Sequence, residues 1–235
     1  MLIIVIQSIR LLLTLSDLAD LRTEIVPQLI SLFETNFSVK LTDESKTIRD
    51  VLQQIHERLF QIYTKPIADR LDNTIQAGLT SPKWAPTGPR ESRNPSPFTS
   101  SVLLDMVIVH TEVSTTAAPL TPDILKYLLE QLLNALTATF KQRAKYSLTD
   151  LMQATLDVEY ISQTLSSYTT DKATVLQTDI YQVLDTRTDN QARVNLQNEL
   201  PSLRLILKRL KESTKAEFAC FRRPKRGTIG ERPGE

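Results

Sequence analysis

The side chains best suited to acid–base or nucleophilic chemistry in this chain are its two histidines, His56 and His110, and its only cysteine, Cys220. Histidine titrates near neutral pH, and a thiolate is a strong nucleophile. A zinc-binding helix would need a second histidine four residues after His56, and Phe60 stands there. We therefore interpret His56 as a half-exposed helix residue.

His110 and Cys220 each allow a chemical and a structural interpretation. His110 lies in the apolar stretch VIVHTEV, where a polar group must find a hydrogen bond, and this favours a core or interface histidine. Basic neighbours could lower the pKa of the Cys220 thiol, but Phe218 and Phe221 favour a small buried hydrophobic residue. An all-α enzyme that uses His110 or Cys220 is the least favoured hypothesis. We expect no catalytic residue, metal site or cofactor.

The scarcity of glycine excludes several site classes. Gly78 and Gly88 are the only glycines before residue 227, so no glycine-rich loop can cradle a phosphate. The net charge of +1 predicts no nucleic-acid partner. A single cysteine excludes an internal disulfide framework and fits a reducing compartment.

Basic residues gather near the end of the chain. Between Arg204 and Arg226 the sequence has nine lysines and arginines but only two acidic residues, Glu212 and Glu217. Cations at a helix end are favourable simply because of the helix dipole, and we prefer this interpretation. The alternative is contact with an anionic membrane surface. The candidate contacts are Arg222, Arg223, Lys225 and Arg226.

The first residues, MLIIVIQSIRLLLTL, are apolar but do not predict a targeting segment. The run from Leu2 to Ile6 is short, Arg10 interrupts it, and no cleavage site of small residues follows. It is also too short to span a bilayer. We expect the start of a buried helix, in a chain that begins like a fragment of something longer.

Apolar residues recur at spacings of three and four along most of the chain, which predicts helices. Pro27 and Pro66 are expected to break or kink two of them. Residues 100–113 are apolar almost all round, and we favour a buried helix over a buried strand. Residues 121–140 have the clearest apolar face, behind Thr121 as the N-cap. Two capping boxes are predicted, at Ser147 with Asp150 and at Thr188 with Gln191. Pro201 is expected to bend the last helix.

Residues 80–100 stand apart, because they hold five of the twelve prolines and the only tryptophan, Trp84. A long connection between two helical blocks explains this composition. The expected organisation is a helical block at 1–78, a proline-rich linker at 79–99, a helical bundle at 100–220 and a disordered basic tail at 221–235. The fold class is all-α, an elongated stack of helical bundles.

Three stretches of the sequence resemble a known protein family, which composition and residue spacing alone do not reveal. They begin LLLTLSDLADLRTEIVPQLISLFETNFSVKL, VHTEVSTTAAPLTPDILKYLLEQLLNAL and YSLTDLMQATLDVEYISQTLSSYTT, and the last continues through RVNLQNELPSLRLILKRLKESTKAEFACF. Together they resemble the C-terminal part of the fungal Sec5 subunit of the exocyst, over roughly residues 10 to 222.

The resemblance implies a non-enzymatic scaffold. The exocyst is a complex that tethers secretory vesicles to the plasma membrane before fusion, and its subunits are rods of stacked helical bundles. The other exocyst subunits would be the partners of this chain, and small GTPases would contact it through the complex. The chain would act in the cytoplasm, at plasma-membrane sites of polarised secretion. The family protein is several times longer, and neither its N-terminal coiled coil nor the GTPase-binding domain of animal members is seen here. A membrane-binding module that acts through the basic C-terminal helix is the alternative function.

Overall fold

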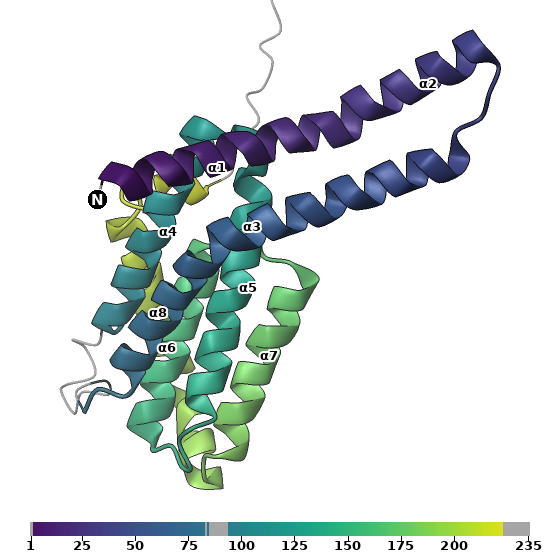
Figure 1. Ribbon diagram of the computed structural model, residues 1–235. Coiled ribbons are helices and arrows are strands. Elements are labelled where there is room, and N and C mark those ends of the chain that lie inside the picture. Colours follow the sequence, from purple (N-terminus) through teal and green to yellow (C-terminus); the bar gives the residue numbers. More distant parts are fainter. Residues whose placement is uncertain (1, 83, 85–93, 223–235) are drawn as a thin grey trace, which may run out of the picture.

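The computed structural model describes residues 2–82, 84 and 94–222. These residues form helices and no strand, apart from one isolated bridge between Tyr146 and Thr188. Figure 1 shows a bundle from which two long helices extend to one side. The α-helices are α1 (Leu2–Asp20), α2 (Val26–Phe37), α3 (Thr42–Leu79), α4 (Pro97–Thr116), α5 (Thr121–Phe140), α6 (Leu148–Thr164), α7 (Asp171–Thr186) and α8 (Asn190–Ser213).

α5 lies at the centre of the bundle, with α3 and α7 packed against it. The apolar face predicted for residues 121–140 is confirmed, because its leucines and Phe140 are all buried. Each of these side chains contributes roughly 1.5–3 kcal/mol when fully buried, so this face stabilises the bundle strongly. Buried residues from Leu12 in α1 to Phe221 near the end of the described chain form one contiguous hydrophobic cluster.

Residues 100–113 lie within helix α4, as expected. Val102, Met106, Val109 and Val113 are buried on one side of it, at helical spacing. Ile108 remains exposed on the other side. A segment that is apolar all round is therefore only half covered by the described residues.

The two predicted proline breaks have different outcomes. At Pro27 the helix continues in the same direction, but a π-helical segment, η1 (Leu21–Ile25), precedes it. A π-helical turn relieves the clash between a proline ring and the preceding turn, so the break becomes a local change of geometry. At Pro66 the helix does not break, because α3 runs from Thr42 to Leu79 without interruption. Buried residues on both sides, including Tyr63 and Leu71, offset the roughly 3 kcal/mol that an internal proline costs.

The N-termini of the helices show which of the predicted N-caps and capping boxes are present. The capping box of Ser147 with Asp150 is confirmed at the start of α6. The box of Thr188 with Gln191 is wrong, since Asp189 is the N-cap of α8 and accepts a hydrogen bond from the Ala192 N–H. Thr121 is also not an N-cap, because the 3₁₀ helix η3 (Ala118–Leu120) leads directly into α5. Pro201 lies inside α8.

The start of the chain is helical, as expected, in α1. The expected burial is only partial, because Leu12 and Leu15 are buried while Ile6, Ile9 and Leu13 are exposed. Within the described ranges, no helix combines the length and the hydropathy needed to cross a membrane.

Candidate functional site

The three residues that could carry chemistry lie in settings that favour structure. His56 is half-buried on α3, where its ring stacks on Phe60 with the centroids 6.3 Å apart, and burial lowers its pKa. His110 on α4 meets the Phe221 ring edge-on at 5.9 Å, and burial lowers its pKa too. Cys220 lies in the 3₁₀ helix η5 (Ala219–Phe221), where burial raises the pKa of its thiol.

These groups do not form a reaction centre. Among the described residues, no hydrogen bond joins His110 to Cys220, and no group of three or more histidine, cysteine, aspartate or glutamate side chains could hold a metal ion. A raised thiol pKa keeps Cys220 protonated and weakly nucleophilic at neutral pH. The basic neighbours of Cys220 therefore do not activate its thiol, in line with a packing role.

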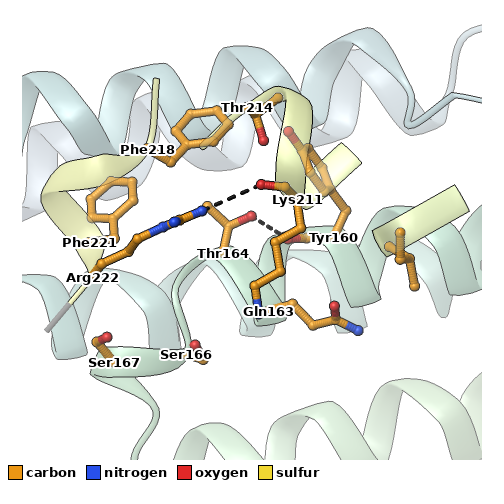
Figure 2. A pocket seen from close by; sticks show the side chains of 11 residues that line it. Tyr160, Gln163, Thr164, Ser166, Ser167, Lys211, Thr214, Phe218, Phe221 and Arg222 are labelled. Atoms are coloured by element: carbon orange, nitrogen blue, oxygen red, sulfur yellow. Dashed lines mark hydrogen bonds between the residues drawn. The ribbon is translucent and has the colours of Figure 1, made fainter. Parts of the chain in front are cut away.

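Of the four basic candidates for an anionic surface, the structure describes Arg222; Arg223, Lys225 and Arg226 lie outside the described residues. Arg222 is exposed and donates a hydrogen bond to the carbonyl of Lys211, with 3.4 Å between nitrogen and oxygen. Figure 2 shows its guanidinium lying across a cavity between α6 and α8. The first candidate thus caps the end of α8.

A buried polar centre around the carboxylate of Asp157 was not predicted from the sequence. Asp157 on α6 is fully buried, and four donors surround its carboxylate. One oxygen accepts from the Ser96 N–H at 2.7 Å and from the Gln153 amide at 3.0 Å. The other accepts from the Trp84 indole at 3.0 Å and from the Ser96 hydroxyl at 2.6 Å. Burial raises the pKa of Asp157 to about 6, and the hydrogen bonds act in the opposite direction.

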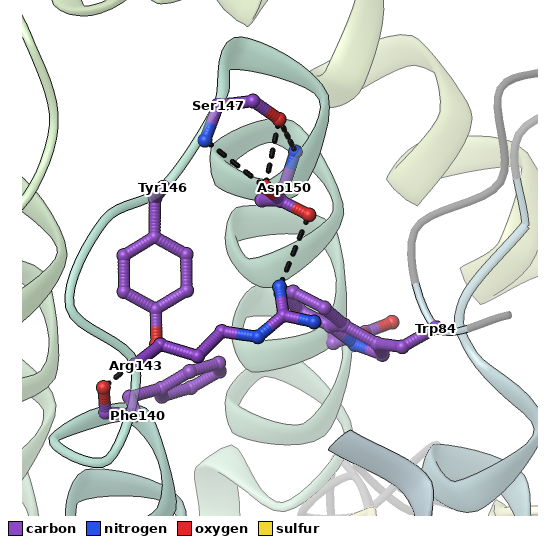
Figure 3. Close-up of polar contacts among 7 residues, drawn as sticks. Trp84, Phe140, Arg143, Tyr146, Ser147 and Asp150 are labelled. Carbon is purple, nitrogen blue, oxygen red and sulfur yellow. Dashed lines mark hydrogen bonds and ion pairs between the residues drawn. The ribbon is translucent and has the colours of Figure 1, made fainter. Parts of the chain in front are cut away.

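Arg143 ties the same tryptophan to the start of α6. Its guanidinium lies 4.9 Å from the centre of the Trp84 ring and makes an ion pair with Asp150 at 3.2 Å, as Figure 3 shows. Asp150 also closes the capping box with Ser147. These contacts therefore fix Trp84 and Ser96, which lie between α3 and α4 in the sequence, to α6. They position a backbone connection and present no reactive group.

The described surface with the strongest sign of a partner is the pair of helices that leaves the bundle. We call residues 21–62 the arm: η1, α2, the turn at residues 38–41 and the first part of α3. Only Ser45 is buried among them. The turn needs a left-handed residue, Ser38, with a φ of 53°. Large apolar side chains of the arm are exposed: Ile25, Leu29, Leu32, Phe33, Phe37, Val39, Ile48, Val51, Ile55 and Ile62.

These apolar side chains follow helical stripes. Leu29, Leu32 and Phe37 are 58%, 59% and 64% exposed on α2. On α3, Ile48, Val51 and Ile55 are spaced as i, i+3 and i+7, which is the seam that another helix packs against. Large exposed apolar side chains at helical spacing are typical of a surface that another protein covers.

Comparison with known proteins agrees with this site-poor, helical architecture. A family model described as Exocyst complex component Sec5 matches residues 4–221. This chain belongs to the Sec5 family. No curated protein and no solved structure matches it significantly.

Membership of this family fits the settings of His56, His110 and Cys220, which favour packing over chemistry. Sec5 is a component of the exocyst, so this chain has an exocyst subunit role, in a family of non-enzymatic scaffolds with the other subunits as partners. The useful parts of a Sec5 chain are then its surfaces and the contacts that hold them in place.

Proposed function

We propose that this Sec5 chain is a scaffold that helps hold secretory vesicles at the plasma membrane before fusion, and that it acts through shape and surface. Its place of action would be the cytoplasmic side of membrane sites of polarised secretion, with small GTPases acting through the assembled complex. One observation carries the proposal: the two-helix arm presents exposed apolar stripes away from its own bundle.

The arm is suited to packing against helices of another exocyst subunit. Roughly 25 cal/mol is gained for each Å² of apolar surface removed from water, and side chains more than half exposed still have that gain available. Association is costly, so several apolar residues must be covered together. The stripes on α2 and α3 supply such a set on adjacent helices.

Replacing the arm's apolar residues tests the scaffold role. In cells, the triple variant Leu29→Ser, Leu32→Ser and Phe37→Ser should co-isolate far less of the other exocyst subunits and secrete poorly. The matched control carries Gln28→Ser, Thr35→Ser and Asn36→Ser, three exposed polar positions of the same helix. Circular dichroism should show both variants folded, because the three apolar side chains are more than half exposed and the ring contact of Phe37 is with Phe33 of the same helix. Normal co-isolation and secretion with the apolar triple would contradict the proposal.

A second candidate function is binding to an anionic membrane through the basic C-terminal segment. The observation in its favour is exposure: Arg204, Lys208, Arg209, Lys211, Lys215 and Arg222 all reach the surface. Each cation near such a membrane contributes about 1 kcal/mol, so the four candidates Arg222, Arg223, Lys225 and Arg226 must be replaced together. Sedimentation with phosphatidylserine vesicles should then drop, and wild-type binding should weaken as salt rises.

A further inference from the structure

A cavity of about 540 Å³ lies where the C-terminal ends of α6 and α8 meet η5. Small-molecule sites have volumes of about 300–1,000 Å³, so the cavity has the size of a ligand site. Figure 2 shows Arg222 and Lys211 extending toward it from opposite sides, with Thr164 between them and Ser166 and Ser167 below. None of these groups has a role in the scaffold function.

The cavity's side chains are cationic. Lys211 and Arg222 line it, and no aspartate or glutamate does so among the described residues. The Lys211 ammonium makes no hydrogen bond or ion pair with any residue that the structure describes. Arg222 uses one N–H for the Lys211 carbonyl, which leaves most of its five donors free. The cavity therefore offers unused charged donors.

The C-termini of α6 and α8 lie at this cavity, and their negative partial charges disfavour a bound anion. Their size must therefore be compared with the positive charges of Lys211 and Arg222. Each C-terminus is equivalent to roughly −0.5 charge, so α6 and α8 together contribute about −1, against two full positive charges. Carbonyls at both ends already accept hydrogen bonds. The Thr164 hydroxyl donates to Tyr160 at 2.7 Å, and the Thr214 hydroxyl donates to Leu210 at 2.8 Å. The charge of Glu217 also acts on Tyr160 in the cavity wall, so the attraction for an anion comes from direct contact with Lys211 and Arg222 and not from the net field.

The same two threonines limit what the ligand can be. Each hydroxyl has one hydrogen, and both hydrogens are used, so Thr164 and Thr214 can only accept hydrogen bonds from a ligand. Lysine and arginine can only donate. A matching ligand carries anionic oxygens and also O–H donors. Phe218 and Phe221, stacked with their centroids 6.3 Å apart, offer an apolar wall for its C–H face.

We propose that this cavity binds a phosphorylated polyol, such as an inositol phosphate, with Lys211 and Arg222 holding the phosphate. Thr164 and Thr214 accept from its hydroxyls. The polyol can be free or the headgroup of a lipid, since both present the same groups. This inference stands apart from the scaffold function, because the arm and the cavity share no residue.

Calorimetric titration of the folded chain with inositol trisphosphate tests the phosphate contacts. Charge-assisted hydrogen bonds are the strong class, so Lys211→Gln with Arg222→Gln should weaken binding at least about tenfold. The matched control is Lys208→Gln with Lys215→Gln, which removes the same charge from exposed positions that do not line the cavity. An equal loss in the control would mean general charge attraction and would overturn the site.

The polyol part has its own test. Inorganic phosphate alone and inositol alone should each bind more weakly than inositol trisphosphate. Thr164→Val should weaken the binding of inositol and of inositol trisphosphate, which carry hydroxyls, and leave the binding of inorganic phosphate unchanged. Phosphate that binds as tightly as inositol trisphosphate would overturn the polyol assignment. A phosphoserine peptide that binds more tightly than inositol trisphosphate would overturn it in favour of a protein ligand.

Vesicles distinguish the two sources of the polyol. Vesicles with a phosphoinositide should bind better than vesicles of equal charge with phosphatidylserine if the ligand is a lipid headgroup, and the difference should vanish in the Lys211 and Arg222 variant. Equal binding to both vesicles, with tight binding of the soluble compound, would assign the free polyol. Either result supports the cavity. No binding of soluble compound or phosphoinositide vesicle would overturn it.

Discussion

The indole N–H of Trp84 donates a hydrogen bond to the carboxylate of Asp157 across 3.0 Å, although 73 positions separate them in the sequence. Trp84 follows the end of α3, and Asp157 lies in the middle of α6. Both are buried. This contact fastens the segment after α3 to the bundle core.

Replacing Trp84 by phenylalanine should destabilise the fold. The ring volume is largely kept, but a buried carboxylate loses one of its four donors, which costs roughly 1–3 kcal/mol. Urea denaturation followed by circular dichroism measures the loss. The control is Tyr127→Phe, which removes a hydroxyl that donates to Gln61 at an exposed site and should change little. Equal stability of Trp84→Phe and wild type would show that the indole hydrogen bond contributes nothing.

Asp157 predicts a pH dependence of a definite sign. Its pKa is about 6 in the folded chain, above the ordinary 3.8, so the folded state binds the proton more tightly than the unfolded state. The contribution of Asp157 to the unfolding free energy is therefore largest below about pH 4 and falls as pH rises to about 6. The full change is on the order of 3 kcal/mol, from about 1.4 kcal/mol per pKa unit.

The measurement compares wild type with Asp157→Asn by urea denaturation at a series of pH values. Asparagine cannot titrate, so the difference in unfolding free energy between the two proteins isolates the carboxyl group. That difference should shift against wild type as pH rises from about 4 to 6. A shift in favour of wild type would mean that the four hydrogen bonds outweigh burial and that the pKa is lowered.

The sequence predicted the helices better than their polar contacts. The α5 leucines and the Ser147 capping box were predictable, because spacing and cap chemistry are local signals. Asp157 was not, because its donors come from Trp84 and Ser96, far away along the chain. One signal was present: an aspartate on the apolar side of residues 151–161, in a chain whose only tryptophan lies in a polar connection. The break expected at Pro66 is absent for the opposite reason, because tertiary packing on both sides of the proline outweighs its local cost in a helix.

Gly78 marks the closest approach of α3 to the start of α4. A Cβ atom at this position would lie 2.5 Å from Cβ and 2.6 Å from Cγ of Phe98, closer than real Cβ atoms come. Gly78→Ala should therefore destabilise the fold by about 1–3 kcal/mol, even though alanine is the better helix former. Urea denaturation checks the loss. In a double-mutant cycle, Phe98→Ala should remove only part of the penalty, because alanine keeps the Cβ atom that lies 2.5 Å away, whereas Phe98→Gly should remove most of it. A penalty that persists with Phe98→Gly would place the strain elsewhere.

Ser147 should stabilise the start of α6 by a measurable amount. Its hydroxyl accepts from the Asp150 N–H at 3.2 Å, while the Asp150 carboxylate accepts from the Ser147 N–H at 3.0 Å. Ser147→Ala leaves a helix N–H without its partner and should lower the unfolding free energy by about 1 kcal/mol. The control Thr47→Ala removes an exposed hydroxyl that bonds only within its own helix, to the Asp43 carbonyl, and should have little effect. Since Asp150 also holds Arg143 against Trp84, Ser147→Ala should in addition change the tryptophan fluorescence of the folded chain. A stability loss without that change would confine the role of Ser147 to the cap.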